Sequence, residues 1–163
     1  MGTVTTVTIS ANNYSVYALV SAPVTEATTF WTGRLGAEST AFLAATADNK
    51  AKALVTAADW IDRALGYKFT GTQTSDTQPR SWPRDGATKN GTALADGVTP
   101  DEVANAQYLL AGILTVNPAL ALGIAAGFAA LGQWQLERSL ESTVEDTRDT
   151  ETAVPLTSVA EPQ

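Results

Sequence analysis

The chain contains neither cysteine nor histidine. These absences exclude thiol and imidazole nucleophiles, zinc sites built on those side chains, and disulfide bonds. Glycine-rich phosphate-binding patterns are also missing, and so is the short motif that presents a nucleophilic serine between a strand and a helix. We therefore expect no enzymatic activity, no cofactor and no metal site.

Positive charge is scarce in the second half of the chain, and the net charge of the whole is -7. Residues 1–90 contain 8 Lys and Arg against 7 Asp and Glu, a net of +1. Residues 91–163 contain 2 against 10, a net of -8. Proteins that grip DNA need a cationic face, because much of their affinity comes from neutralising phosphates. The second half is thus a poor candidate for DNA binding, whereas the first half could contact DNA locally.

Length and hydrophobic content predict one helical domain with extended ends. The chain has 163 residues, of which 44% are hydrophobic, and this is enough for one core. We expect a mainly α fold: a small bundle of three to four helices, a long ordered loop, and extended N- and C-terminal arms. The expected parts are an arm or strand at 1–22, a helical domain at 23–131 with its loop at 67–98, and an acidic arm at 132–163.

The clearest periodic segment lies in the middle of the chain. Leu54, Ala58, Ile61 and Leu65 recur at helical spacing and predict a helix that begins near residues 46–48 and ends before Gly66. A weaker pattern predicts an earlier helix at about residues 24–35.

A further helix is predicted after residue 99. Thr99-Pro100-Asp101-Glu102 has the form of a capping box, in which the threonine and glutamate side chains satisfy each other's backbone amides. Asn117-Pro118 predicts the end of this helix.

Besides the extended C-terminal arm, extended structure is expected at the N-terminus and within the long loop. Residues 3–9 alternate threonine with apolar residues, which fits either a short strand or a loose terminus. In the long loop, the turn dipeptides Asp85-Gly86 and Asn90-Gly91 predict a small hairpin.

Asp59 and Asp62 lie on the polar side of the central helix. Paired carboxylates can serve acid–base chemistry or hold Mg²⁺. A solvated helix face is the favoured interpretation, because no second acidic cluster and no basic partner accompanies the pair.

Arg80, Trp82 and Arg84 form a basic and aromatic cluster in the loop. In a nucleic-acid-binding protein, the tryptophan could stack on a base while the arginines meet phosphates. We favour a structural role, in which Trp82 packs under the loop, Pro83 fixes the turn and Arg84 pairs with a carboxylate. Trp82, Pro83 and Arg84 are therefore the candidate loop anchor.

Residues 119–131 are almost wholly apolar. This stretch is too short to span a bilayer, which needs about 20 residues, so we expect no membrane partner. A buried helix or a contact between subunits is the favoured interpretation. The candidate interface residues are Leu120, Leu122, Ile124, Phe128, Leu131 and Trp134.

Several motifs follow one another in a recognisable order. They are Glu26-Ala27 before Phe30-Trp31, Ala58-Asp59-Trp60-Ile61-Asp62, Thr72 to Ser75, Ser81-Trp82-Pro83-Arg84, and the helix after Thr99. Together they resemble the head-to-tail connector (adaptor) proteins of tailed phages, a family that also carries the label DnaT-like single-stranded-DNA-binding. The resemblance covers about residues 14–117, and the segments after it depart from the family pattern.

The resemblance implies a structural protein of the virion neck, assembled in the host cytoplasm. It implies a ring, expected to be dodecameric, with partners in the portal ring, neighbouring copies and the next neck or tail-completion protein. DNA would pass through without specific binding, and Glu141, Glu145 and Asp149 are candidate acidic residues of the channel wall. The alternative is a single-stranded-DNA-binding accessory protein whose affinity is lost on Trp82→Ala or Arg84→Ala. A helical domain with another use is the remaining interpretation.

Overall fold

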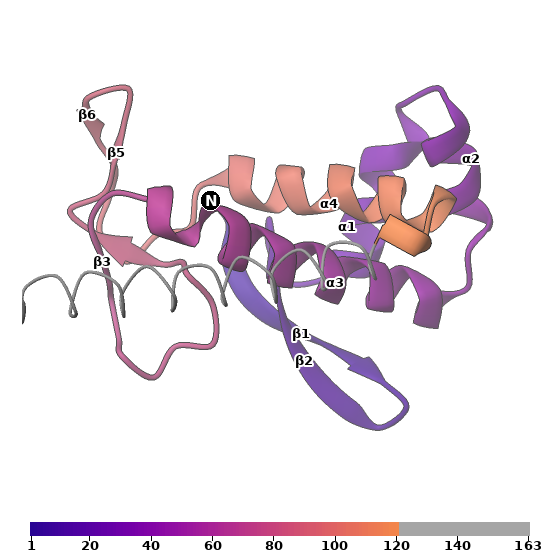
Figure 1. The fold of residues 1–163 in the computed structure, drawn as a ribbon, viewed down its shortest axis with the longest axis horizontal. Helices are drawn as coiled ribbons and strands as arrows, with labels where there is room; N and C mark the ends of the chain where they lie inside the picture. The colour runs from indigo at the N-terminus through magenta and orange to yellow at the C-terminus, as the bar shows by residue number, and fades with distance from the viewer. Residues whose placement is uncertain (121–163) are drawn as a thin grey trace, which may run out of the picture. The chain divides into compact units, whose positions relative to one another are not determined.

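The computed structural model describes residues 1–120, and within them helices and small antiparallel sheets both contribute to the fold (Figure 1). The elements are β1 (Thr3–Ile9), β2 (Asn12–Ala18), α1 (Pro23–Thr32), α2 (Ala37–Ala44), α3 (Ala47–Leu65), the 3-10 turn η1 (Gly66–Lys68), β3 (Thr72–Gln73), β4 (Arg84–Asp85), β5 (Thr88–Lys89), β6 (Thr92–Ala93) and α4 (Asp101–Val116). The prediction of a mainly α bundle was therefore wrong, and the fold class is mixed α and β.

The N-terminal residues form a hairpin. β1 and β2 pair in antiparallel register from Thr3 with Ala18 to Ile9 with Asn12. The turn residues Ser10 and Ala11 both have positive φ, as the tight turns of two-residue hairpins require. The expected strand at residues 3–9 is present, and the loose-terminus alternative was wrong. Its partner β2 was not expected, because the buried run Val16–Ala18 shows no alternation with polar residues.

The helical core is built mainly by α3 and α4, which lie side by side with the hairpin packed against α3 (Figure 1). α3 begins as predicted: the Thr46 hydroxyl accepts a hydrogen bond from the Asn49 amide at 3.3 Å. Leu54, Ala58 and Ile61 of the predicted stripe are buried. The helix ends at Leu65, also as predicted.

The start of α4 differs from the predicted capping box. No side-chain hydrogen bond caps this helix, and Pro100 occupies the N-cap position. Thr99 is buried and pairs with Gly2 in an isolated β-bridge, so its backbone is committed to tertiary contacts. The Glu102 carboxylate pairs with Lys89 instead of reaching back to the cap. The helix ends at Val116, before the predicted Asn117-Pro118 stop.

The long loop is ordered by short elements. β3 pairs with β4, and β5 pairs with β6 around Asn90-Gly91, where both residues have positive φ. The predicted small hairpin is confirmed at this turn. The first predicted helix is shorter than expected and ends at Thr32, and the following helix α2 was not predicted.

Most of the predicted C-terminal interface lies outside the described residues. Leu120 is the last described residue, and its side chain is exposed. The remaining candidates are all outside the described part of the chain: Leu122, Ile124, Phe128, Leu131, Trp134, Glu141, Glu145 and Asp149.

Candidate functional site

The guanidinium of Arg80 connects three segments of residues 1–120. It lies 2.6 Å from Asp59 Oδ1 and 3.1 Å from Asp62 Oδ2, both on α3. Its Nε also donates to the Ser15 carbonyl of the hairpin at 2.8 Å. The side chain is only 7% exposed. A single buried cation thus joins the long loop to α3 and to β2.

Asp62 is the second centre of this network. It accepts hydrogen bonds from the Tyr17 hydroxyl and from the Ser81 amide, the latter at 3.2 Å. Burial, together with the charge of Asp62, raises the pKa of Tyr17 above its ordinary value, so the phenol stays protonated and donates. The prediction of a solvated helix face is wrong for Asp62 and only half right for Asp59, whose side chain is partly exposed.

The network leaves these aspartates poorly suited to chemistry, because Arg80 pairs with both of them and Asp62 also accepts from Tyr17 and Ser81. A general base or a metal ligand needs a carboxylate that is free to meet its substrate or ion. Among residues 1–120, no group of three acidic side chains is arranged to hold a metal ion. The geometry assigns the pair to holding the fold together.

The candidate loop anchor is directed inward. Trp82 is 4% exposed and is joined to Pro83 by a cis peptide bond. Its ring meets that of Phe69 edge-on, with 5.5 Å between the ring centroids. Arg84 donates to the carbonyls of Thr70 at 2.8 Å and Gly71 at 2.6 Å. The expected carboxylate partner for Arg84 was wrong, because main-chain carbonyls take that place.

A second polar centre lies where the hairpin leads into α1. The Glu26 carboxylate accepts hydrogen bonds from the amides of Leu19, Ser21 and Ala22 at 2.6, 2.9 and 2.8 Å, and from the Tyr108 hydroxyl at 2.7 Å. Burial raises the pKa of Glu26, but the hydrogen bonds from Tyr108 and the amides outweigh it and hold the pKa below its ordinary 4.5.

We expect Glu26→Gln to lower the stability of the protein at neutral pH by about 1–2 kcal/mol, because charge-assisted hydrogen bonds are replaced by weaker ones. A depressed carboxyl pKa adds stability above the unfolded pKa of 4.5, and that stability is lost as pH falls through the folded value. The variant should therefore lose less stability below pH 4.5 than the wild type. Urea unfolding at neutral and acidic pH measures both effects.

Glu38→Gln is the matched control for this prediction, because Glu38 occupies the first turn of α2 as Glu26 does that of α1. If both variants showed the same pH dependence, the role given to the Glu26 carboxylate would be wrong.

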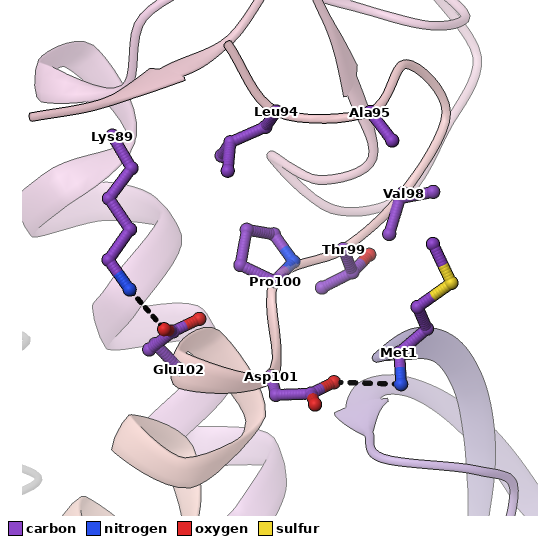
Figure 2. Close-up of a pocket in the computed structure, with 9 residues that line it drawn as sticks. All are labelled: Met1, Lys89, Leu94, Ala95, Val98, Thr99, Pro100, Asp101 and Glu102. Atoms are coloured by element: carbon purple, nitrogen blue, oxygen red, sulfur yellow. Dashed lines mark hydrogen bonds and ion pairs between the residues drawn. The ribbon is translucent and has the colours of Figure 1, made fainter. Parts of the chain in front are cut away.

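A pocket of about 290 Å³ opens at the start of α4 (Figure 2). Its lining is largely apolar, with Leu94, Val98 and Pro100 among the contributing side chains. Its charged groups satisfy one another: Lys89 pairs with Glu102, and the amino group of Met1 lies 3.1 Å from Asp101. The pocket therefore presents no unpaired charge to recognise a ligand.

One exposed aromatic residue was missed by the sequence reasoning. Tyr67 in η1 is 78% exposed, whereas Phe69, two residues later, packs inward against Trp82. A lone tyrosine carries no periodic signal, and only the structure shows that it faces outward beside Lys68.

Comparison with known proteins gives one family. No curated protein and no solved structure gives a significant match to this chain. None of the helices in residues 1–120 is long and apolar enough to cross a membrane. The model of a family described as "Putative DnaT-like ssDNA binding protein" matches residues 10–124, which is more than half of the chain. By this match, the chain belongs to the family of putative DnaT-like ssDNA binding proteins.

Proposed function

We propose that this protein binds single-stranded DNA and has no catalytic activity. The observation that carries the proposal is the family match over residues 10–124, which spans every described element after β1. The charge distribution supports it in part, because residues 1–90 hold 8 of the 10 cationic side chains. The acidic balance of the remainder favours weak, salt-sensitive binding.

The geometry limits how such binding could occur. Trp82 is buried, so its ring offers no face for a base to stack on. Arg80 is occupied by two aspartates and Arg84 by three main-chain carbonyls. Direct contact of Trp82 and Arg84 with DNA was the less favoured interpretation of this cluster, and it does not fit the geometry. Substituting either residue would act on DNA binding through the fold.

Fluorescence anisotropy tests the proposal with the full chain and a labelled oligo-dT of about 30 nucleotides, which is longer than one binding site of about 4–16 nucleotides. We expect binding at low salt that weakens with a log–log salt slope of about -1.4 to -2.1, as two or three phosphate contacts to a single strand would give. A duplex of equal length is the control. Absence of binding at low salt would refute the proposal. Equal affinity for the duplex would show that the protein does not prefer single-stranded DNA.

The second candidate is a structural adaptor of a tailed-phage neck, located in the virion. The order of motifs between Glu26 and Arg84 favours it, as does the net charge of -8 in residues 91–163. A ring of such chains under the portal would use heterologous contacts that close by rotation. Like charge on a channel wall would let DNA slide past without sticking.

Cryo-electron microscopy of the protein mixed with its cognate portal ring tests the adaptor. The adaptor predicts an added ring with portal-matched symmetry, with Glu141, Glu145 and Asp149 facing the channel. A map with these three residues on the outer wall of the ring would contradict their proposed position on the channel wall. A portal that gains no density at high protein concentration would count against the adaptor altogether.

A further inference from the structure

The end of α3 and the turn η1 carry an exposed aromatic ring, with one cationic side chain before it and one after it in the sequence. Tyr67 is 78% exposed, and the Lys68 ammonium lies 5.6 Å from the centroid of its ring. Arg63, one helical turn before Tyr67, is also exposed. Arg63 belongs to the last turn of α3, and Tyr67 and Lys68 belong to the turn η1 that follows it directly.

Charge around this ring suits a polyanion. Residues 63–75 contain Arg63 and Lys68 but no carboxylate. The nearest acidic residues of α3, Asp59 and Asp62, are both bound by Arg80. Within residues 1–120, neither Arg63 nor Lys68 takes part in an ion pair, so each can meet a phosphate.

The buried motif of the loop holds this surface in place. Phe69 packs on Trp82, directly after the exposed pair. Arg84 holds the carbonyls of Thr70 and Gly71. A stacking residue needs a fixed backbone, because a ring that must be ordered on binding loses part of its affinity. The loop anchor thus supports the neighbouring exposed ring.

We infer that Tyr67, Lys68 and Arg63 form the contact with single-stranded DNA, with a base stacked on Tyr67 and flanking phosphates beside the two cations. This inference rests on the proposed function. Sequence-tolerant binding of this kind combines aromatic rings with cationic side chains, since every base has a face to stack and every nucleotide a phosphate.

The first test compares Tyr67→Ala with Tyr14→Ala in the full chain, using labelled oligo-dT and fluorescence anisotropy at low salt. We expect Tyr67→Ala to weaken binding at least about fivefold, because it removes one stacked base. Tyr67→Phe, which keeps the ring, should bind like the wild type. Tyr14 is 40% exposed on β2 and is the matched control, with no loss of affinity expected. Circular dichroism shows that each variant is folded.

The second test compares Lys68→Glu with Lys52→Glu. Lys52 is an exposed residue near the other end of α3 and serves as the matched control. Both variants change the net charge equally, so a long-range field would affect both alike. A direct contact predicts that only Lys68→Glu makes the salt slope less negative, by about 0.7.

The outcomes separate the site from the function. Wild-type protein that binds DNA while Tyr67→Ala binds equally well would overturn this site and leave the proposed function standing. Equal losses for Lys68→Glu and Lys52→Glu would also overturn it. Wild-type protein that fails to bind oligo-dT would overturn both the function and the site.

Discussion

Replacing Arg80 with alanine is expected to destabilise the protein by about 3–5 kcal/mol, because it removes one partner from a buried ionic network. Asp62 and the Ser15 carbonyl would lose their cation in a place that water reaches poorly. Natural domains are stable by only about 5–15 kcal/mol, so the loss is a large fraction of the total. Urea unfolding followed by circular dichroism measures it.

Lys89→Ala is the matched control for Arg80→Ala. Lys89 also forms an ion pair, but its side chain and that of its partner Glu102 are exposed, at 53% and 62%. Exposed pairs contribute at most about 1 kcal/mol, since water screens them. Similar losses for the two variants would mean that the Arg80 network contributes no more than a surface pair. Should Arg80→Ala not fold, Asp59→Asn gives a milder test of the same network.

Gly112→Ala is expected to cost about 2–3 kcal/mol by overpacking the contact between α4 and α1. A Cβ atom at this position would lie 2.5 Å from Cε2 and 2.9 Å from Cη2 of Trp31, and closer still to Cζ2. The indole cannot easily move aside, because it is buried and its Nε1 donates to the Tyr108 carbonyl at 2.9 Å. The better helix propensity of alanine offsets about 1 kcal/mol at most.

Gly33→Ala provides the comparison, since a Cβ atom there would meet no atom within 4 Å and its φ of -85° suits any residue. We expect a change within about 0.5 kcal/mol for it, as for most surface substitutions. Thermal unfolding should show a melting temperature lowered by about 5–10 °C for Gly112→Ala alone. Equal melting temperatures would show that the helix contact relaxes to admit a methyl group.

The parts of the fold that local pattern dictates could be predicted from the sequence. α3 was located by its apolar stripe and its Thr46 cap, and the small hairpin by the left-handed turn at Asn90-Gly91. β2 could not be found in this way, because its buried end Val16–Ala18 looks like any apolar run. Missing this strand made the expected fold class too helical.

The residues of the Arg80 network and the loop anchor could be identified in the sequence, but the residues that they contact could not. Asp59 and Asp62 looked solvated because Arg80 lies 21 and 18 residues further along the chain, and no local spacing predicts that pairing. Trp82 was recognised as a loop residue that packs or binds, and burial decides between the two. The exposure of Tyr67 was not predicted, because the direction of a side chain just after a helix depends on the conformation of the following turn.

The contacts that secure the first hairpin have a consequence for synthesis. Its hydrogen-bond partners come much later in the chain. Ser15 is bonded to Arg80, 65 residues later, and Tyr17 to Gln107, 90 residues later. Glu26, just after the hairpin, is bonded to Tyr108, 82 residues later. A two-stranded hairpin is marginal by itself in water. The β1–β2 hairpin is the first segment to leave the ribosome. We therefore expect it to become stable only after α4 has been translated. Chains released before α4 would expose the unpaired strands β1 and β2, which are edges for aggregation or for chaperones.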